Sequence, residues 1–176
     1  LEQFTANEMN VSTVDYIEVK KPIPFLKDRV VLVDTPGLND VNELRSIVTY
    51  HYIPRADVVF YLLDCRAALR QTEYEFITDT LLKNGLDKII FLANFADQID
   101  EDDLTRVLNR VESDLKKGTG LENVEIIPFS ALEASEREDE ELFELSGMPI
   151  VLQKIQTLCH VGTRQQEKTV RFTMRL

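Results

Sequence analysis

Short apolar runs alternate with longer polar stretches along this chain, and the apolar runs predict strands. The segments 57–64 (DVVFYLLD) and 88–93 (KIIFLA) are almost continuously apolar, which is typical of strands covered on both faces in a parallel sheet. The segment 124–128 (VEIIP) predicts a further strand. Earlier, 14–20 (VDYIEVK) alternates and 29–34 (RVVLVD) is apolar, so these two segments predict neighbouring strands that pair antiparallel.

Helical patterns occupy the intervals between the predicted strands. A short helix is expected over 41–50, and a longer one over 72–83. The longer helix begins with a capping-box pattern, in which Thr72 is followed three residues later by Glu75. Asn84-Gly85 marks its end, because glycine readily takes the left-handed conformation that closes a helix.

The second half of the chain continues this alternation. An amphipathic helix is expected over 100–117, ended by Gly118. The acidic segment 133–144 (EASEREDEELFE) is expected to be a solvated loop or helix face, and a last helical pattern starts at Pro149 and is interrupted near Gly162. Strands and helices in this order predict a three-layer α/β fold with a mostly parallel sheet and one antiparallel strand pair.

Composition and charge restrict the possible classes of function. The 176 residues are enough for one domain, and 44% hydrophobic with 29% charged residues is the composition of a globular protein. The net charge of −11 argues against non-specific binding of nucleic acid, which requires a basic surface. No apolar run of about eighteen residues predicts a membrane-spanning helix. Cys65 and Cys159 are expected to be reduced core thiols.

The residues that directly follow each predicted strand are the candidates for chemistry, because ligands of parallel sheets bind beyond the carboxyl ends of the strands. Four short segments take that position: DTPG over 34–37, DCRA over 64–67, NFAD over 94–97 and SAL over 130–132. All four are expected to lie at one edge of the sheet.

The DTPG segment has two interpretations. Asp34 can hold a Mg²⁺ ion, through a water because Mg²⁺ keeps much of its hydration shell, and Gly37 lets its backbone N–H approach a phosphate closely. Alternatively, the segment is a plain turn built from the residues that favour turns. Taken alone, the motif does not decide between a metal site and a turn.

The other two segments point to a purine base. Asp97 can accept two parallel hydrogen bonds from a guanine ring N–H and its exocyclic amine, a donor pair that adenine lacks, and Asn94 can brace the loop. In the SAL segment, Ser130, Ala131 and Leu132 form a small-residue turn that can bring a backbone N–H to a base oxygen. Each signal is weak alone.

In this order and placement the motifs resemble those of P-loop GTPases. DTPG is similar to the DxxG switch motif, NFAD to the N/T-K-x-D guanine-specificity motif, and SAL to the base loop. The stretch VLVDTPGLND over 31–40, followed by ADVVFYLLD, looks most like the dynamin-like GTPases of bacteria. The resemblance spans about residues 14–160.

The resemblance implies a P-loop-NTPase-like GTPase head over 1–160 and the start of a helical stalk over 161–176. It implies GTP as the substrate, with Mg²⁺ as the cofactor, and places Asp34, Thr35 and Gly37 at the catalytic end. It further implies a homodimer formed through the heads and action at a membrane lipid surface through regions outside this chain. The implied location is cytoplasmic, peripheral to the membrane.

Three departures from the family pattern bear on this reading. Phe95 stands where the pattern has lysine, and it could stack on the base or pack in the core. Leu38 cannot orient the attacking water as a glutamine would, so the resemblance implies that other residues and a second head do so. The sequence contains no G-x-x-x-x-G-K-[ST] phosphate loop. We therefore expect that loop to lie upstream of Leu1, the sheet to be incomplete at its N-terminal side, and the chain alone to show no GTPase activity.

Two alternatives to a GTPase stay open. The chain could be a catalytically silent interaction module on the GTPase fold, for which Phe95 in place of lysine is the main support. It could also be a different α/β enzyme in which Asp34 and Asp64 share a metal, although that reading leaves the placement of NFAD and SAL unexplained.

Overall fold

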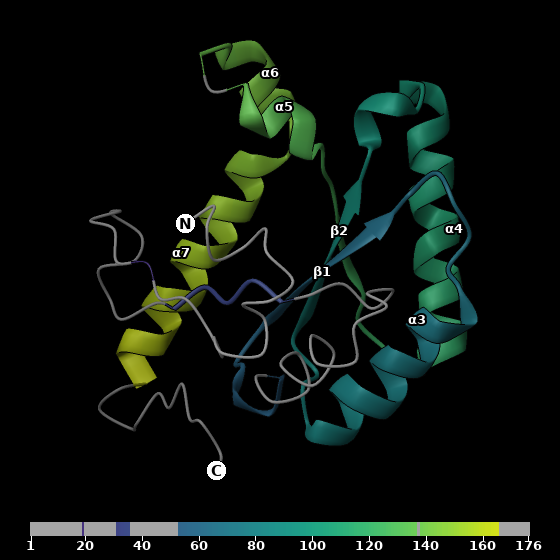
Figure 1. Cartoon of the computed structure of the whole chain (residues 1–176), viewed down its shortest axis with the longest axis vertical. Coiled ribbons are helices and arrows are strands. Elements are labelled where there is room, and N and C mark those ends of the chain that lie inside the picture. Colours follow the sequence, from purple (N-terminus) through teal and green to yellow (C-terminus); the bar gives the residue numbers. More distant parts are fainter. Residues whose placement is uncertain (1–18, 20–30, 36–52, 137, 166–176) are drawn as a thin grey trace, which may run out of the picture.

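A parallel sheet lies between two layers of helices in this molecule (Figure 1). The computed structural model describes residues 19, 31–35, 53–136 and 138–165 of the 176-residue chain. In that part of the chain the layers confirm the predicted three-layer α/β fold with a mostly parallel sheet.

The sheet has the order β1-β2-β3, formed by β1 (Val59–Asp64), β2 (Ile89–Asn94) and β3 (Glu125–Pro128). Both neighbouring pairs are parallel, and all three strands lie where the apolar runs predict them. In the register Asp64 lies beside Asn94, and Ala93 lies beside Pro128. The carboxyl ends of the strands are therefore level with one another.

Helices connect the strands and cover both faces of the sheet. Their bounds are η3 (Ile53–Arg55), α3 (Gln71–Glu75), the π-helical η4 (Phe76–Leu81), η5 (Leu82–Asn84), η6 (Ala96–Gln98), α4 (Glu101–Thr119), α5 (Ala131–Ser135), α6 (Glu140–Leu145) and α7 (Met148–Gln165). Figure 1 shows α3 and α4 on one side of the sheet and α7 on the other. Among the described residues, no helix combines the length and the apolar character needed to cross a bilayer.

The core has two halves because side chains of successive strand residues point to opposite faces. On one face, Phe91 of β2 is fully buried and packs in a cluster with Leu81 and Leu115 of the covering helices. On the other face, Leu92 packs in a second cluster with Val151 and Ile155 of α7. Strand β2 is thus buried on both faces, which explains its continuous apolar sequence.

The predicted helix over 72–83 forms, but its start differs from the prediction. The first helical residue is Gln71, and the Glu73 carboxylate accepts a hydrogen bond from the Arg70 backbone N–H at 2.7 Å. The expected pairing of Thr72 with Glu75 as a capping box is therefore wrong, because Thr72 already lies inside the first turn. The predicted end is confirmed, since Gly85 takes a left-handed conformation with φ 77°.

Two other glycines have roles that differ from those expected. Helix α4 runs past Gly118 to Thr119 and is closed by Gly120, which has φ 76°. A Cβ on Gly118 would lie 2.4 Å from the ring of Tyr74, so this glycine permits close packing of α3 on α4. Helix α7 continues through Gly162 without the predicted interruption. Helix α7 crosses residue 160 without a break. The predicted boundary between head and stalk at 160/161 stays a prediction.

The predicted strand over 29–34 is wrong for its described part. Residues 31–35 belong to no strand or helix, and Val31, Leu32 and Val33 are 66%, 57% and 49% exposed. An apolar segment becomes a strand only when another strand satisfies its backbone groups, and no described strand pairs with it. The predicted antiparallel pair is therefore absent from the described residues. The predicted strand over 14–20, Val19 aside, and the helix over 41–50 lie outside the described residues.

Candidate functional site

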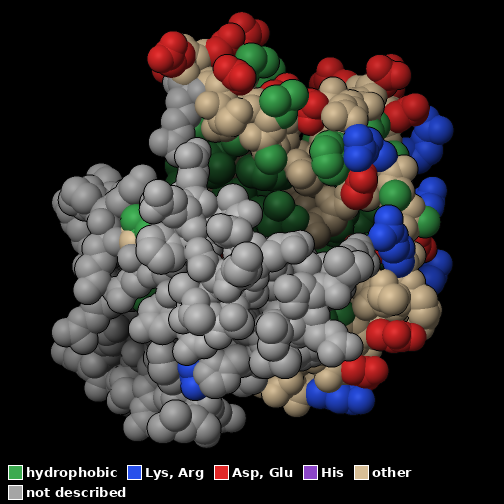
Figure 2. Space-filling model, viewed as in Figure 1, with side chains coloured by type: hydrophobic (Ala, Val, Ile, Leu, Met, Phe, Trp, Pro, Cys, Tyr) green, Lys and Arg blue, Asp and Glu red, His purple; other side chains and the backbone are tan. Residues whose placement is uncertain are grey.

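The candidate site lies at the edge of the sheet where β1, β2 and β3 end. Because these strands are parallel and in register, the segments 64–67, 94–97 and 130–132 meet at this edge, as the sequence predicts. In Figure 1 this edge faces the gap between α5 and the beginning of α4. Figure 2 shows acidic side chains around it, over α6 and the first turn of α4.

Asn94 joins the loops that follow β2 and β3. We call these two loops, 94–97 and 130–132, the base-side loops, because the sequence predicts that they hold a purine base. Its side-chain Oδ1 accepts a hydrogen bond from the backbone N–H of Ala131 at 3.0 Å, across 37 positions of sequence. The backbone adds two further links, from Ala96 N–H to the Phe129 carbonyl at 3.1 Å and from Phe129 N–H to the Ala93 carbonyl at 3.0 Å. The NFAD and SAL segments are thus held as one unit, and the bracing role expected of Asn94 is seen directly.

Ser130 anchors the SAL loop from inside the protein. Its side chain is almost fully buried, and its Oγ accepts a hydrogen bond from the Glu133 backbone N–H, which caps α5. Its own N–H donates to the Ser146 carbonyl at 2.9 Å. Next to Ser146, Gly147 has φ 78° and lies against Pro128 so closely that a Cβ there would be 2.1 Å from the Pro128 carbonyl oxygen. The turn between α6 and α7 therefore fixes the position of the base loop.

The three backbone N–H groups of the SAL loop differ in whether they already have a hydrogen-bond partner. The N–H groups of Ser130 and Ala131 are both engaged, the first by Ser146 and the second by Asn94. Among the described residues, Leu132 N–H makes no hydrogen bond, and the Leu132 side chain is 65% exposed. Of the three backbone N–H groups of this loop, that of Leu132 is therefore the one left free by the described residues.

Asp97 presents a carboxylate to solvent beside these loops. It is exposed in η6, and its oxygens accept no hydrogen bond from any described residue. Its charge is close enough to add to the effect of burial in raising the pKa of Glu133 across the site. An accessible carboxylate on a braced loop can accept two parallel hydrogen bonds from a planar donor pair.

Phe95 and Arg66 form a contact that sequence reasoning did not foresee. Phe95 has φ 69°, and among the described residues it is the only residue other than glycine with a positive φ. The guanidinium of Arg66 lies 3.6 Å from the centre of its ring. The sequence does contain a signal that Arg66 lies near Asp64, since it follows this strand-end aspartate by two residues. Nothing in the sequence indicates that its target is Phe95.

Asp64 and Cys65, which end and follow β1, have structural partners. Arg66 binds both carboxylate oxygens of Asp64, from Nε at 2.9 Å and from Nη2 at 2.8 Å, and this bonding holds the Asp64 pKa below its usual range. Cys65 is buried and free, as expected for a core thiol, and its Sγ lies 2.9 Å from the Asn94 carbonyl. The pKa of its thiol is raised, mainly because the thiol is buried. With both oxygens of Asp64 engaged by Arg66, a metal shared with Asp34 is disfavoured.

The phosphate-side candidates are not joined to the base-side loops. Asp34 and Thr35 are exposed, and within the described part of the chain neither bonds to the segments 94–97 or 130–132. Gly37 lies outside the described residues. In the same part of the chain, no group of three His, Cys, Asp or Glu side chains is placed to hold a metal ion.

Comparisons with known proteins identify relatives of this chain. A family model described as the dynamin family matches residues 2–96. An uncharacterised protein from the xynA 3' region of Caldicellulosiruptor is 31% identical over 82% of this chain and 36% of its own length. Dynamin-like protein 1 of Campylobacter jejuni is 32% identical over 66% of this chain and 16% of its own length. This chain therefore spans about a third or less of the relatives that it matches.

A solved structure of a bacterial dynamin is similar to this chain in its fold. It is a chain of an oligomerised bacterial dynamin pair, described as a mechanism for the long-range sensing and tethering of membranes. The match has a TM-score of 0.62 and 26% identity, and it covers 76% of this chain and 24% of that one.

Proposed function

This chain belongs to the dynamin family, and we propose that it supplies the guanine-recognising side of a head that binds and hydrolyses GTP. The observation that carries the proposal is the bond from Ala131 N–H to Asn94 Oδ1, because it makes one rigid unit of the two loops that would hold the base. Oriented polar groups on a fixed scaffold recognise a ligand without the cost of ordering them at the moment of binding.

On the base side, Asp97 accepts hydrogen bonds from the guanine ring N–H and the exocyclic amine. The N–H of Leu132 donates to the base oxygen, since the neighbouring donors of the loop are already engaged. Adenine has neither this donor pair nor an acceptor oxygen in that place, so the Asp97 carboxylate and the Leu132 N–H would reject it. Unpaired polar groups cost more free energy than matched ones gain, which is the source of the selectivity.

On the phosphate side, Asp34, Thr35 and Gly37 are the residues of this chain that we assign to the γ-phosphate. Mg²⁺, when bound, would neutralise phosphate charge, and Asp34 would meet it through a water. The described residues hold no complete metal site, so the other ligands would be phosphate oxygens and groups outside the described part. The chemistry then rests on positioning and charge stabilisation.

The assembly that we propose follows the structural relative. A homodimer formed through the heads, acting peripherally at a membrane lipid surface, is consistent with likeness to a chain of an oligomerised bacterial dynamin pair. We further propose that residues 1–160 belong to the head and that 161–176 begin a helical stalk.

The test is Asp97→Asn in the full-length protein, with Asp102→Asn as the matched control on the exposed first turn of α4. Asp97→Asn should weaken GTP affinity about 10- to 100-fold, because a charge-assisted pair of hydrogen bonds is lost, and it should improve binding of xanthosine triphosphate. Asp102→Asn should change neither affinity. Equal affinities for GTP in both variants and the wild type would remove Asp97 from the base site.

A silent interaction module is the second candidate, and the observation that favours it is Phe95 in place of lysine. A full-length protein that neither binds nor hydrolyses GTP would overturn the GTPase proposal and favour this alternative. Measurable GTP turnover would exclude it.

A further inference from the structure

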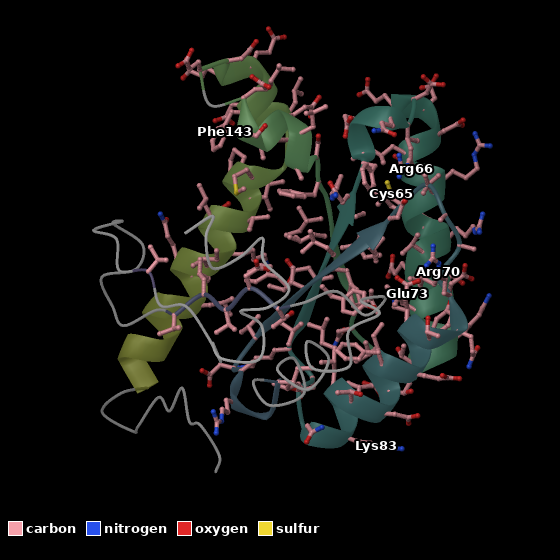
Figure 3. All side chains as sticks on the ribbon, in the orientation of Figure 1. Cys65, Arg66, Arg70, Glu73, Lys83 and Phe143 are labelled. Carbon is pink, nitrogen blue, oxygen red and sulfur yellow. The ribbon has the colours of Figure 1, made fainter. Side chains whose placement is uncertain are left out.

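Arg66 lies at the centre of a small cluster beside the candidate base site. Three of its side-chain nitrogens have partners: Nε and Nη2 donate to the two oxygens of Asp64, and Nη1 donates to Oε1 of Gln98. The guanidinium lies over the ring of Phe95, with Cζ 3.6 Å from the ring centre. Figure 3 shows Arg66 and Cys65 together at the end of β1, next to α4.

The geometry of this cluster uses properties that only arginine has. A guanidinium presents its N–H groups as a flat fork, which matches a carboxylate at two points and leaves its face free to stack on an aromatic ring. Asp64 ends β1, so the anchor of the fork is part of the sheet, and the Arg66 backbone N–H also donates to Asp64 Oδ1 at 3.0 Å. The cation is therefore fixed although its side chain is 41% exposed.

The two residues that Arg66 reaches flank Asp97 in sequence. Phe95 lies two positions before Asp97, and Gln98 directly follows it. Phe95 is also the point of backbone strain, because a bulky residue at φ 69° is unfavourable without surrounding support. Phe95 packs against the core on one side, and Arg66, from the loop after β1, adds a cation over its ring and a hydrogen bond to Gln98.

We propose that Arg66 is a positioning residue: anchored on Asp64, it holds Phe95 and Gln98 and thereby sets the place of the Asp97 carboxylate against the guanine base. This inference rests on the proposed function. It also explains how the loop tolerates an aromatic residue at position 95, since the ring serves as the surface on which the cation stacks.

A lysine at position 95 should disturb this cluster. Phe95→Lys would place an ammonium group beside the guanidinium of Arg66, and two like charges at that distance repel each other. The substitution should therefore weaken binding while Arg66 is present. Replacing Arg66 by glutamine in the same chain should then recover part of the loss.

The experiment measures GDP and ADP affinity and GTP turnover of the full-length protein. Arg66→Ala should weaken GDP binding about tenfold and lower the ratio of GDP to ADP affinity, with kcat at saturating GTP within about twofold of the wild type. Arg106→Ala is the matched control, because Arg106 is an exposed arginine that pairs with Asp103 one turn away on α4. It should match the wild type.

Arg66→Lys keeps the charge but not the flat fork, so it serves if Arg66→Ala does not fold, and it should show an intermediate loss. A further test compares Phe95→Lys with the double variant that also carries Arg66→Gln. Here removal of Arg66 should strengthen GDP binding, so the double variant should bind GDP better than the single one.

Each result decides a different question. A wild-type protein that does not bind GDP overturns the proposed function. A wild-type protein that binds GDP, with Arg66→Ala or Arg66→Lys equal to Arg106→Ala, overturns only the role of Arg66. Equal losses for GDP and ADP would show a merely structural residue and also overturn it, as would Phe95→Lys binding GDP more tightly than the wild type.

Discussion

The base-side loops and the segment 31–35 differ in what holds them. The loops after β2 and β3 are tied by Asn94 to Ala131, by Ser130 to Ser146 and by the close packing of Gly147. The segment 31–35 is exposed and unpaired by any described strand, although it begins with three apolar residues, Val31, Leu32 and Val33. The difference shows that a motif becomes a site only where neighbouring elements satisfy its backbone and fix its side chains.

The largest expected effect is on the free energy of unfolding, because the sheet that carries the base-side loops has buried side chains and the segment 31–35 is exposed. Phe91→Ala should lower the free energy of unfolding by about 3–5 kcal/mol, because it empties a fully buried position on β2. Val33→Ala should change it by less than about 0.5 kcal/mol, because Val33 is half exposed. Chemical denaturation of both variants of the full-length protein measures the difference. Comparable losses would mean that Val33 is packed as Phe91 is.

A pair of glycines tests whether close packing fixes the base loop. Gly147→Ala should cost about 3 kcal/mol, since it combines an unfavourable positive φ with a clash against the Pro128 carbonyl. Gly85→Ala has the same sign of φ but no atom within 4 Å, so it should cost only about 1 kcal/mol.

The same pair should also differ in nucleotide binding. We expect weaker GDP affinity in Gly147→Ala and unchanged affinity in Gly85→Ala, measured at a temperature where both remain folded. Equal melting temperatures for the two variants would contradict the account of Gly147.

The brace between the loops should have a smaller effect on stability and a clear one on binding. Asn94→Ala should cost about 1 kcal/mol of stability, because Ala131 N–H loses its partner, and it should weaken GDP binding. Asn94→Asp keeps an acceptor oxygen and should preserve the stability. If thermal melting shows equal losses in both variants, the hydrogen bond is not what Asn94 contributes.

The smallest effect concerns pH. Bonding to Arg66 lowers the pKa of Asp64 in the folded protein below its usual value of 3.8. The bond therefore adds stability above about pH 4, and this contribution disappears as the pH falls through the lowered folded-state pKa. It should be smaller than the effect of Asn94, since the pair is partly exposed and screened.

The measurement is the difference in unfolding free energy between the wild type and Asp64→Asn. That difference should be present at pH 7 and shrink towards pH 3. A difference that stayed constant with pH would show that the Asp64 charge does not contribute.

Several features followed from the sequence alone. The segments 57–64, 88–93 and 124–128 predicted β1, β2 and β3. The expected burial on both faces is confirmed for β2, whereas Leu62 of β1 is 55% exposed. Parallel order then placed 94–97 and 130–132 at the same edge of the sheet. The NFAD and SAL motifs could be found because they lie at the ends of β2 and β3.

Only the tertiary structure decided which groups meet. The bond from Ala131 to Asn94 and the packing of Gly147 on Pro128 join parts of the chain that local patterns treat as independent. The stacking of Arg66 on Phe95 likewise joins the ends of two strands. The apolar segment 31–34 failed as a strand for the same physical reason. A strand requires a partner whose backbone it can bond, and a local pattern of residues does not contain that partner.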